Sequence, residues 1–196
     1  CPGDLNKAFF TICGASSIEN AIKLARLYTG RHKILTRYQS YHGASIGAIS
    51  ASGDPRRIPV DVQQAPNFIH FDLPYAYRYE YGEENLLKDS ISQLERMIAY
   101  EGPNNIAAIL LEGQSGSSGC FLYPDGYLKT VREICNNHGI LLIMDEVMSG
   151  FGRTGKWFGF QHHDIIPDMI AMAKGLTCGY LPFGCLMVRD KIASKY

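Results

Sequence analysis

An acidic and a basic side chain each follow a short apolar run in this sequence. Asp145 follows Leu-Leu-Ile-Met at residues 141–144, and Lys174 follows Met-Ile-Ala-Met-Ala at residues 169–173. Such runs are typical of strands that are buried in a mostly parallel sheet. Ligands of these sheets bind at the carboxyl ends of the strands, so we expect Asp145 and Lys174 to face one crevice.

Further polar side chains follow other strand-like runs. Tyr41 and His42 lie in a loop after residues 33–36, and Glu112 follows the apolar residues 106–111. A single polar residue at a strand end is more often a turn or cap residue than a ligand. Several of them, after successive strands of one sheet, favour a binding site.

A turn of small residues, Gly14-Ala15-Ser16, precedes a segment with helical periodicity. The first backbone N–H groups of a helix and the helix dipole can together hold a phosphate. Ser16 and Glu19 have the spacing of a capping box, which predicts that the helix starts near Ser17. Gly30 is expected to end it.

Apolar runs alternate with helical periodicity along the chain, which predicts an α/β fold with a mostly parallel sheet and helices on both faces. We expect one domain over residues 1–196, without an internal linker, as a piece of a longer protein. Residues 53–84 are rich in Pro and Tyr and are expected to form a long ordered excursion over the surface or into a subunit interface. Helices are expected near residues 17–29, through Ile49, and at 86–100 and 127–137; strands are expected at 9–11, 33–36, 106–111, 141–145, 169–173 and 185–188.

Composition excludes several classes of protein. The 19 Lys and Arg residues balance the 19 Asp and Glu residues, so no charge excess favours a nucleic acid or a membrane surface. No apolar stretch is long enough to span a membrane. The six cysteines form no C-x-x-C pair, which favours free thiols and a cytoplasmic location.

Two other motifs contain residue types that occur in binding sites. The cluster His162-His163-Asp164 has no further His or Cys at ligand spacing, so no metal is expected. The segment 150–155 matches the dinucleotide fingerprint G-x-G-x-x-G, but no amphipathic helix follows it, so a nicotinamide cofactor is not expected.

Taken together, a lysine that forms a Schiff base and a carboxylate that pairs with a pyridinium nitrogen are what pyridoxal 5′-phosphate chemistry requires. The blocks that contain these residues, in order, closely resemble the class III (omega) aminotransferases of fold type I. They are Thr29-Gly-Arg-His-Lys33, Ser40-Tyr-His-Gly43, the stretch from Asp145 to Gly155, Ala173-Lys-Gly175 and Gly179-Tyr-Leu-Pro-Phe-Gly184. The sequences of residues 3–11 and 18–21 are most similar to those of the taurine–pyruvate and omega-amino acid–pyruvate branch. The resemblance implies that residues 1–196 form the large cofactor-binding domain.

The resemblance also implies roles for individual residues. Lys174 would bind the cofactor and move a proton, and Asp145 would keep the pyridine nitrogen protonated. Val147 and Tyr41 would pack on opposite faces of the ring. The remaining cofactor-binding candidates are the backbone amides of Gly14 and Ala15, with Glu112 and His42 in supporting roles.

Three positions depart from the family pattern. Ala15 lacks the hydroxyl that relatives offer to the phosphate. Met148 stands where many relatives have a glutamine that bonds the phenolic oxygen of the cofactor, and Gly113 replaces a proline. Because Lys174 and Asp145 are intact, these changes are interpreted as branch variation.

The resemblance implies transfer of an amino group from an amine or omega-amino acid, of the taurine or beta-alanine type, to a 2-oxo acid such as pyruvate. It also implies a homodimer with shared active sites. Other fold type I chemistry (aminomutase, racemase or decarboxylase) requires the same residues, and a non-catalytic relative would keep the fold alone. The sequence leaves these alternatives open.

Overall fold

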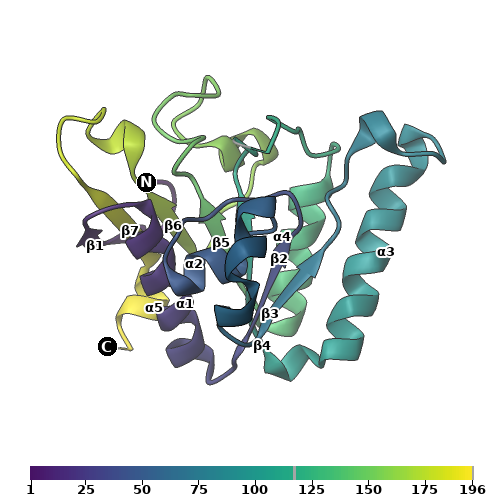
Figure 1. Ribbon diagram of the computed structural model, residues 1–196, viewed down its shortest axis with the longest axis horizontal. Coiled ribbons are helices and arrows are strands. Elements are labelled where there is room, and N and C mark those ends of the chain that lie inside the picture. The colour runs from purple at the N-terminus through teal and green to yellow at the C-terminus, as the bar shows by residue number, and fades with distance from the viewer. Residues whose placement is uncertain (117, 196) are drawn as a thin grey trace.

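The computed structural model describes residues 1–116 and 118–195. A seven-stranded sheet lies between two layers of helices (Figure 1). The strands are β1 (Leu5–Thr11), β2 (Lys33–Arg37), β3 (Phe68–Phe71), β4 (Ile106–Glu112), β5 (Leu141–Asp145), β6 (Met169–Met172) and β7 (Gly184–Arg189). The helices are α1 (Gly14–Thr29), α2 (Ile46–Ala51), α3 (Glu83–Glu101), α4 (Tyr127–His138) and α5 (Asp190–Ala193).

The strand order across the sheet is β1-β7-β6-β5-β4-β2-β3. Strands β3, β2, β4, β5 and β6 are parallel to their neighbours in that series. Strand β7 is antiparallel to β6, and β1 is antiparallel to β7. The prediction of a mostly parallel sheet is therefore confirmed, and the reversal is confined to one edge.

Two separate apolar cores cover the two faces of the sheet, as β5 illustrates. Leu142 and Met144 pack toward α3 and α4, whereas Leu141 and Ile143 pack toward α1 and α2. Successive side chains of a strand point to opposite faces, so a strand that is buried on both sides must be apolar throughout. Each fully buried Leu or Ile contributes about 1.5–3 kcal/mol through removal from water. The predicted helices on both faces are confirmed.

Helix α1 begins three residues earlier than the capping box predicted. Its first residue is Gly14, and the Ser16 hydroxyl donates to the carbonyl of Cys13. Glu19 does not fold back on its own helix. One of its carboxylate oxygens accepts hydrogen bonds from Gly47 N (2.7 Å) and Ala48 N (3.1 Å) at the start of α2. The spacing of Ser16 and Glu19 was thus misleading, because Glu19 satisfies the first amides of a neighbouring helix.

Gly30 ends α1 in the left-handed conformation, with a φ of 69°, as predicted.

The expected excursion over residues 53–84 contains a strand that the sequence did not reveal. Strand β3 pairs in parallel with β2 at the sheet edge. It has only four residues, includes His70 and lies between Pro66 and Pro74, so its pattern is too short and too polar for periodicity to detect. Around it, residues 55–63 and 76–78 form short helical turns.

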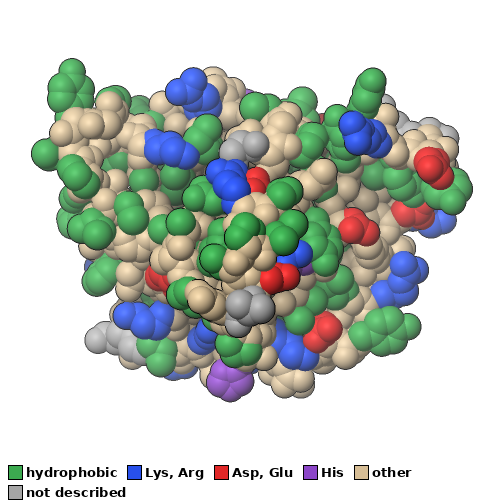
Figure 2. Space-filling model, viewed as in Figure 1, with side chains coloured by type: hydrophobic (Ala, Val, Ile, Leu, Met, Phe, Trp, Pro, Cys, Tyr) green, Lys and Arg blue, Asp and Glu red, His purple; other side chains and the backbone are tan. Residues whose placement is uncertain are grey.

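Positive and negative side chains are interspersed on the face that Figure 2 shows. Hydrophobic side chains gather at the edge formed by β1, β7 and the loop before β7, where Phe10, Ile12, Tyr180 and Leu181 are exposed. Among the described residues, no helix combines the length and the apolar composition needed to cross a membrane. None of the six cysteines, all of which the structure describes, is paired in a disulfide.

Candidate functional site

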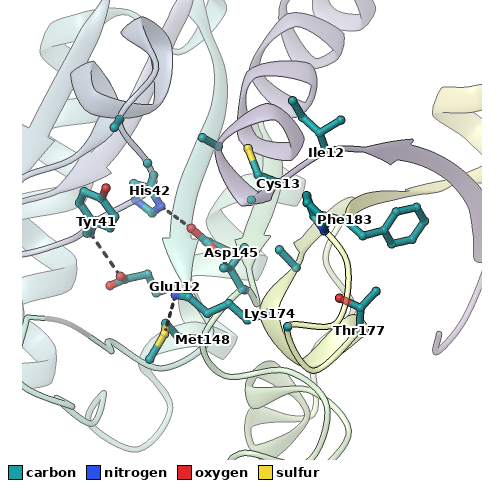
Figure 3. Close-up of a pocket in the computed structure, with 18 of the residues that line it drawn as sticks. Ile12, Cys13, Tyr41, His42, Glu112, Asp145, Met148, Lys174, Thr177 and Phe183 are labelled. Carbon is teal, nitrogen blue, oxygen red and sulfur yellow. Dashed lines mark hydrogen bonds and ion pairs between the residues drawn. The ribbon is translucent and has the colours of Figure 1, made fainter.

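A cavity of about 580 Å³ opens at the carboxyl ends of the central strands (Figure 3). All eight residues that the sequence singled out line it. They are Gly14, Ala15, Tyr41, His42, Glu112, Asp145, Val147 and Lys174. They come from the start of α1, the loop after β2 and the ends of β4, β5 and β6. The structure therefore brings together residues that are up to 160 positions apart, because parallel strands end at a common edge.

Two carboxylates enter the cavity from neighbouring strands. Glu112 and Asp145 are the last residues of β4 and β5, and they are register partners in the sheet. Each continues the alternation of its strand on the face covered by α1. Both side chains are nearly buried. This alternation explains why both acids lie on the same side as the N-terminus of α1.

Asp145 is held in one orientation by two donors. Nδ1 of His42 lies 2.8 Å from Oδ2, and the backbone N–H of Val147 donates to Oδ1 at 3.0 Å. His42 is itself fixed, since its backbone N–H donates to the hydroxyl of Ser52 and its Nε2 lies 3.4 Å from the hydroxyl of Thr36. The carboxylate is thus presented to the cavity with its direction set by the protein.

Lys174 follows β6 with a φ of +41°, a conformation that residues other than glycine rarely adopt. Such strain persists only where the surrounding structure imposes it, and it concentrates at functional sites. The ammonium Nζ lies 2.7 Å from Sδ of Met148 (Figure 3). The amine therefore reaches the cavity beside Met148.

Two glycines, one at the N-terminus of α1 and one in the loop beside it, have no room for a Cβ atom. A Cβ atom on Gly14 would lie 2.9 Å from Cγ2 of Val147, and one on Gly43 would lie 2.6 Å from Cβ of Ala15. These contacts require glycine at both positions. They leave the first turn of the helix with its backbone exposed to the cavity, where an anion can approach.

Cys13 precedes this turn and lines the cavity. Its sulfur lies 3.1 Å from the Ser16 hydroxyl. That hydroxyl, with the backbone N–H groups of Ser16 and Ala15, lowers the pKa of the thiol. The start of α1 thus already favours negative charge on a neighbouring atom.

Sequence reasoning missed two arginines at the site. The guanidinium of Arg56 lies 3.8 Å from the ring centre of Tyr41 and is bonded to Asp54. Arg37, at the end of β2, forms a buried ion pair with Glu112. Burial raises the pKa of Glu112, and the charge of Arg37 opposes that rise. The signal for this pair was opposite charges at the ends of β2 and β4, which are neighbours in the sheet.

The rejected metal cluster lies away from this cavity. Nε2 of His162 lies 3.0 Å from the backbone oxygen of Thr154. In the part of the chain that the structure describes, no three His, Cys, Asp or Glu side chains are gathered to hold a metal ion.

Comparison with known proteins agrees with this geometry. The family model described as aminotransferase class-III matches residues 1–196. The taurine–pyruvate aminotransferase of Bilophila wadsworthia is 38% identical over 202 residues, which is 100% of this chain and 44% of the relative. The acetylornithine aminotransferase of Methanopyrus kandleri is 39% identical over 196 residues, which is 100% of this chain and 45% of the relative.

Solved structures give the same result. The taurine:2-oxoglutarate aminotransferase of Bifidobacterium kashiwanohense, solved with pyridoxal phosphate and glutamate, superposes with a TM-score of 0.94 at 47% identity, over 97% of this chain and 44% of that one. An omega-transaminase of Thermomicrobium roseum superposes with a TM-score of 0.95 at 42% identity, over 98% and 45%. The chain spans under half the length of these relatives. Sequence, family model and fold agree: the chain belongs to the class III aminotransferase family.

Proposed function

We propose that this chain is the large cofactor-binding domain of a pyridoxal phosphate-dependent aminotransferase. The observation that carries the proposal is the convergence of Lys174, Asp145 and the N-terminus of α1 on one cavity. An amine, a carboxylate and exposed helix amides match the aldehyde, the ring nitrogen and the phosphate of this cofactor. The cavity volume lies within the range of small-molecule sites.

The residues that line the cavity fit both the phosphate and the ring of the cofactor. Gly14 and Ala15 would offer backbone amides to the phosphate, since the close contacts of Gly14 and Gly43 keep side chains away from that turn. Val147 would pack on one face of the ring, and the aromatic ring of Tyr41 on the other. Glu112 supports the loop that carries Tyr41, because its Oε1 accepts the backbone N–H of Tyr41 at 3.3 Å.

When bound, the cofactor supplies a carbonyl carbon for amines and a ring that accepts electrons from the neighbouring carbon. The protein's contribution is to place charge and protons. Asp145, oriented by His42 and Val147, holds a negative charge where a protonated ring nitrogen would lie. Lys174 would hold the cofactor through Nζ and would take up and return a proton at that atom.

Lys174 is exposed at the cavity. Its nearest polar contact is the thioether of Met148, which is a weak acceptor and leaves the amine little tied to one orientation. Met148 also cannot donate to the phenolic oxygen of the cofactor as a glutamine would, so we propose that this contact is made differently here from in relatives with glutamine.

For substrates we propose an amine or omega-amino acid donor of the taurine or beta-alanine type and a 2-oxo acid acceptor, with pyruvate first and 2-oxoglutarate second. The relatives that are named for taurine support the donor, and they differ from one another in the acceptor that their names give. We also propose a homodimer with shared active sites and, from the free thiols, a cytoplasmic location.

The test uses the full-length protein and its Lys174→Ala variant. We expect the wild type to bind pyridoxal phosphate with visible absorbance, and borohydride reduction followed by peptide mass spectrometry to place the cofactor on Lys174. Taurine or beta-alanine with a 2-oxo acid should then yield the corresponding amino acid. Retention of both the absorbance and turnover in Lys174→Ala would reject the assignment. Cofactor binding without amino-acid product would instead favour another fold type I reaction.

A further inference from the structure

Arg37 is the largest side chain that is fully buried in the described part of the chain. It ends β2, next to the cavity but not in its lining. A buried guanidinium without partners would cost several kcal/mol, so its contacts show what the fold requires of it.

The guanidinium joins two elements that end at the cavity. On one side, Nε donates to the Tyr123 hydroxyl at 3.1 Å and Nη2 pairs with Glu112. On the other side, Nη1 donates to the backbone oxygens of Gln39 at 2.7 Å and Tyr38 at 3.3 Å. One planar group with five donors thus ties the end of β4 to the loop after β2.

That loop carries the aromatic ring and the imidazole of the site. Gln39 has a φ of +55°, so the chain makes a strained turn just before Tyr41 and His42. Arg37 binds the loop at this turn, and Glu112, its ion-pair partner, accepts the N–H of Tyr41 at 3.3 Å. The Tyr123 hydroxyl closes the network by donating to the backbone oxygen of Glu112.

We propose that Arg37 is a positioning residue for the cofactor site, which fixes the ring of Tyr41 and the His42 partner of Asp145 through the turn at Gln39. The inference rests on the proposed function for the identity of the ligand. Arg37 acts through the loop, since it does not line the cavity itself. The competing explanation is that Arg37 only neutralises the buried charge of Glu112.

A double-variant cycle separates the two explanations in the full-length protein. Arg37→Met removes the loop contacts and leaves Glu112 unpaired. Glu112→Gln keeps an amide oxygen for the N–H of Tyr41 but carries no charge. The double variant Arg37→Met/Glu112→Gln therefore removes the buried unpaired charge without restoring the bonds to Tyr38 and Gln39. The readouts are the melting temperature, the dissociation constant of pyridoxal phosphate and the visible circular dichroism of the bound cofactor, which reports its asymmetric surroundings.

We expect Arg37→Met to weaken cofactor binding about tenfold or more and to change the circular dichroism. The double variant should regain melting temperature but neither affinity nor dichroism. As a matched control, Arg132→Met breaks another largely buried ion pair, with Asp168 at the opposite end of the sheet. It should lower the melting temperature while leaving the dichroism unchanged.

Two results would overturn the proposal: recovery of affinity and dichroism in the double variant, or wild-type dichroism in Arg37→Met. If Arg37→Met does not fold, Tyr123→Phe perturbs the same network more mildly, because it removes the hydroxyl that accepts from Arg37 and donates to Glu112. It should shift the dichroism in the same direction, and unchanged dichroism in this variant would count against the proposal. Failure of the wild type to bind pyridoxal phosphate would be a separate result, since it would reject the proposed function itself.

Discussion

His42 and Asp145 lie 103 positions apart in the sequence, yet Nδ1 of one is 2.8 Å from Oδ2 of the other. Both side chains are buried, and the second oxygen of Asp145 accepts the backbone N–H of Val147. The acid that would face the cofactor ring is thus fixed by one partner from the loop after β2 and another from its own chain.

Asp145→Asn should leave pyridoxal phosphate bound and lower the rate of amine transfer to the cofactor by about 10²-fold or more. The amide keeps the shape of the side chain but removes the negative charge opposite the ring nitrogen. Single-turnover kinetics with an amine donor would measure the loss, and Asp125→Asn, a change at an exposed residue, serves as the control. A rate within a few-fold of wild type would show that the charge of Asp145 is not used.

Gly14→Ala should weaken cofactor binding, because its Cβ would lie 2.9 Å from Val147 and would displace that side chain or the helix start. Titration with pyridoxal phosphate would measure the effect. The double variant Gly14→Ala/Val147→Ala creates room for the new methyl group and should recover part of the affinity. If the single variant binds as wild type does, the tight packing at this turn has no role in the site.

Alkylation should distinguish Cys13 from Cys135. The pKa of Cys13 is lowered by the Ser16 hydroxyl and nearby backbone amides, whereas burial raises the pKa of Cys135 to about 12. Iodoacetamide should therefore modify Cys13 much faster, with a rate that levels off below the pH expected of an ordinary thiol. Peptide mass spectrometry over a pH series gives both rates.

Pyridoxal phosphate should slow the labelling of Cys13 if its phosphate lies at the start of α1. Equal labelling with and without the cofactor would place the phosphate elsewhere, and Cys13→Ser identifies the peptide.

Asp168 should make the stability of the protein depend on pH in the acid range. Burial alone would raise its pKa, but Arg132, Lys191 and the N–H of Leu142 together lower it. A lowered folded pKa means that the contribution is complete above the unfolded pKa of about 3.9. It is lost as pH falls through the lower folded value.

Urea unfolding at pH 7 should show that Asp168→Asn is less stable than wild type by about 3–5 kcal/mol, because it leaves buried positive charge unpaired. The difference should shrink as the pH is lowered below 4. A difference that stays constant with pH would show that the carboxylate charge is not the cause.

The sequence was sufficient to predict that Asp145 and Lys174 share a site. Each directly follows an unbroken apolar run, and such runs are strands of a buried sheet. It was insufficient to predict contacts between residues that only the tertiary fold brings together. Glu19 has a capping spacing within α1 but binds the amides of α2. Arg37 ends a strand whose sequence gives no sign of its bonds to Tyr123, Tyr38 and Gln39. The four residues of β3 are held in the sheet by β2 rather than by their own pattern.

The reversed direction of β7 has a consequence for how this family can diversify. Since β7 runs back alongside β6, the segment from Lys174 to Phe183 leaves and re-enters the sheet at one end, over the rim of the cavity. Residues could be inserted or deleted there without altering the pairing of any strand. This hairpin is therefore a place where evolution could reshape the entrance of the cavity while the lysine keeps its position.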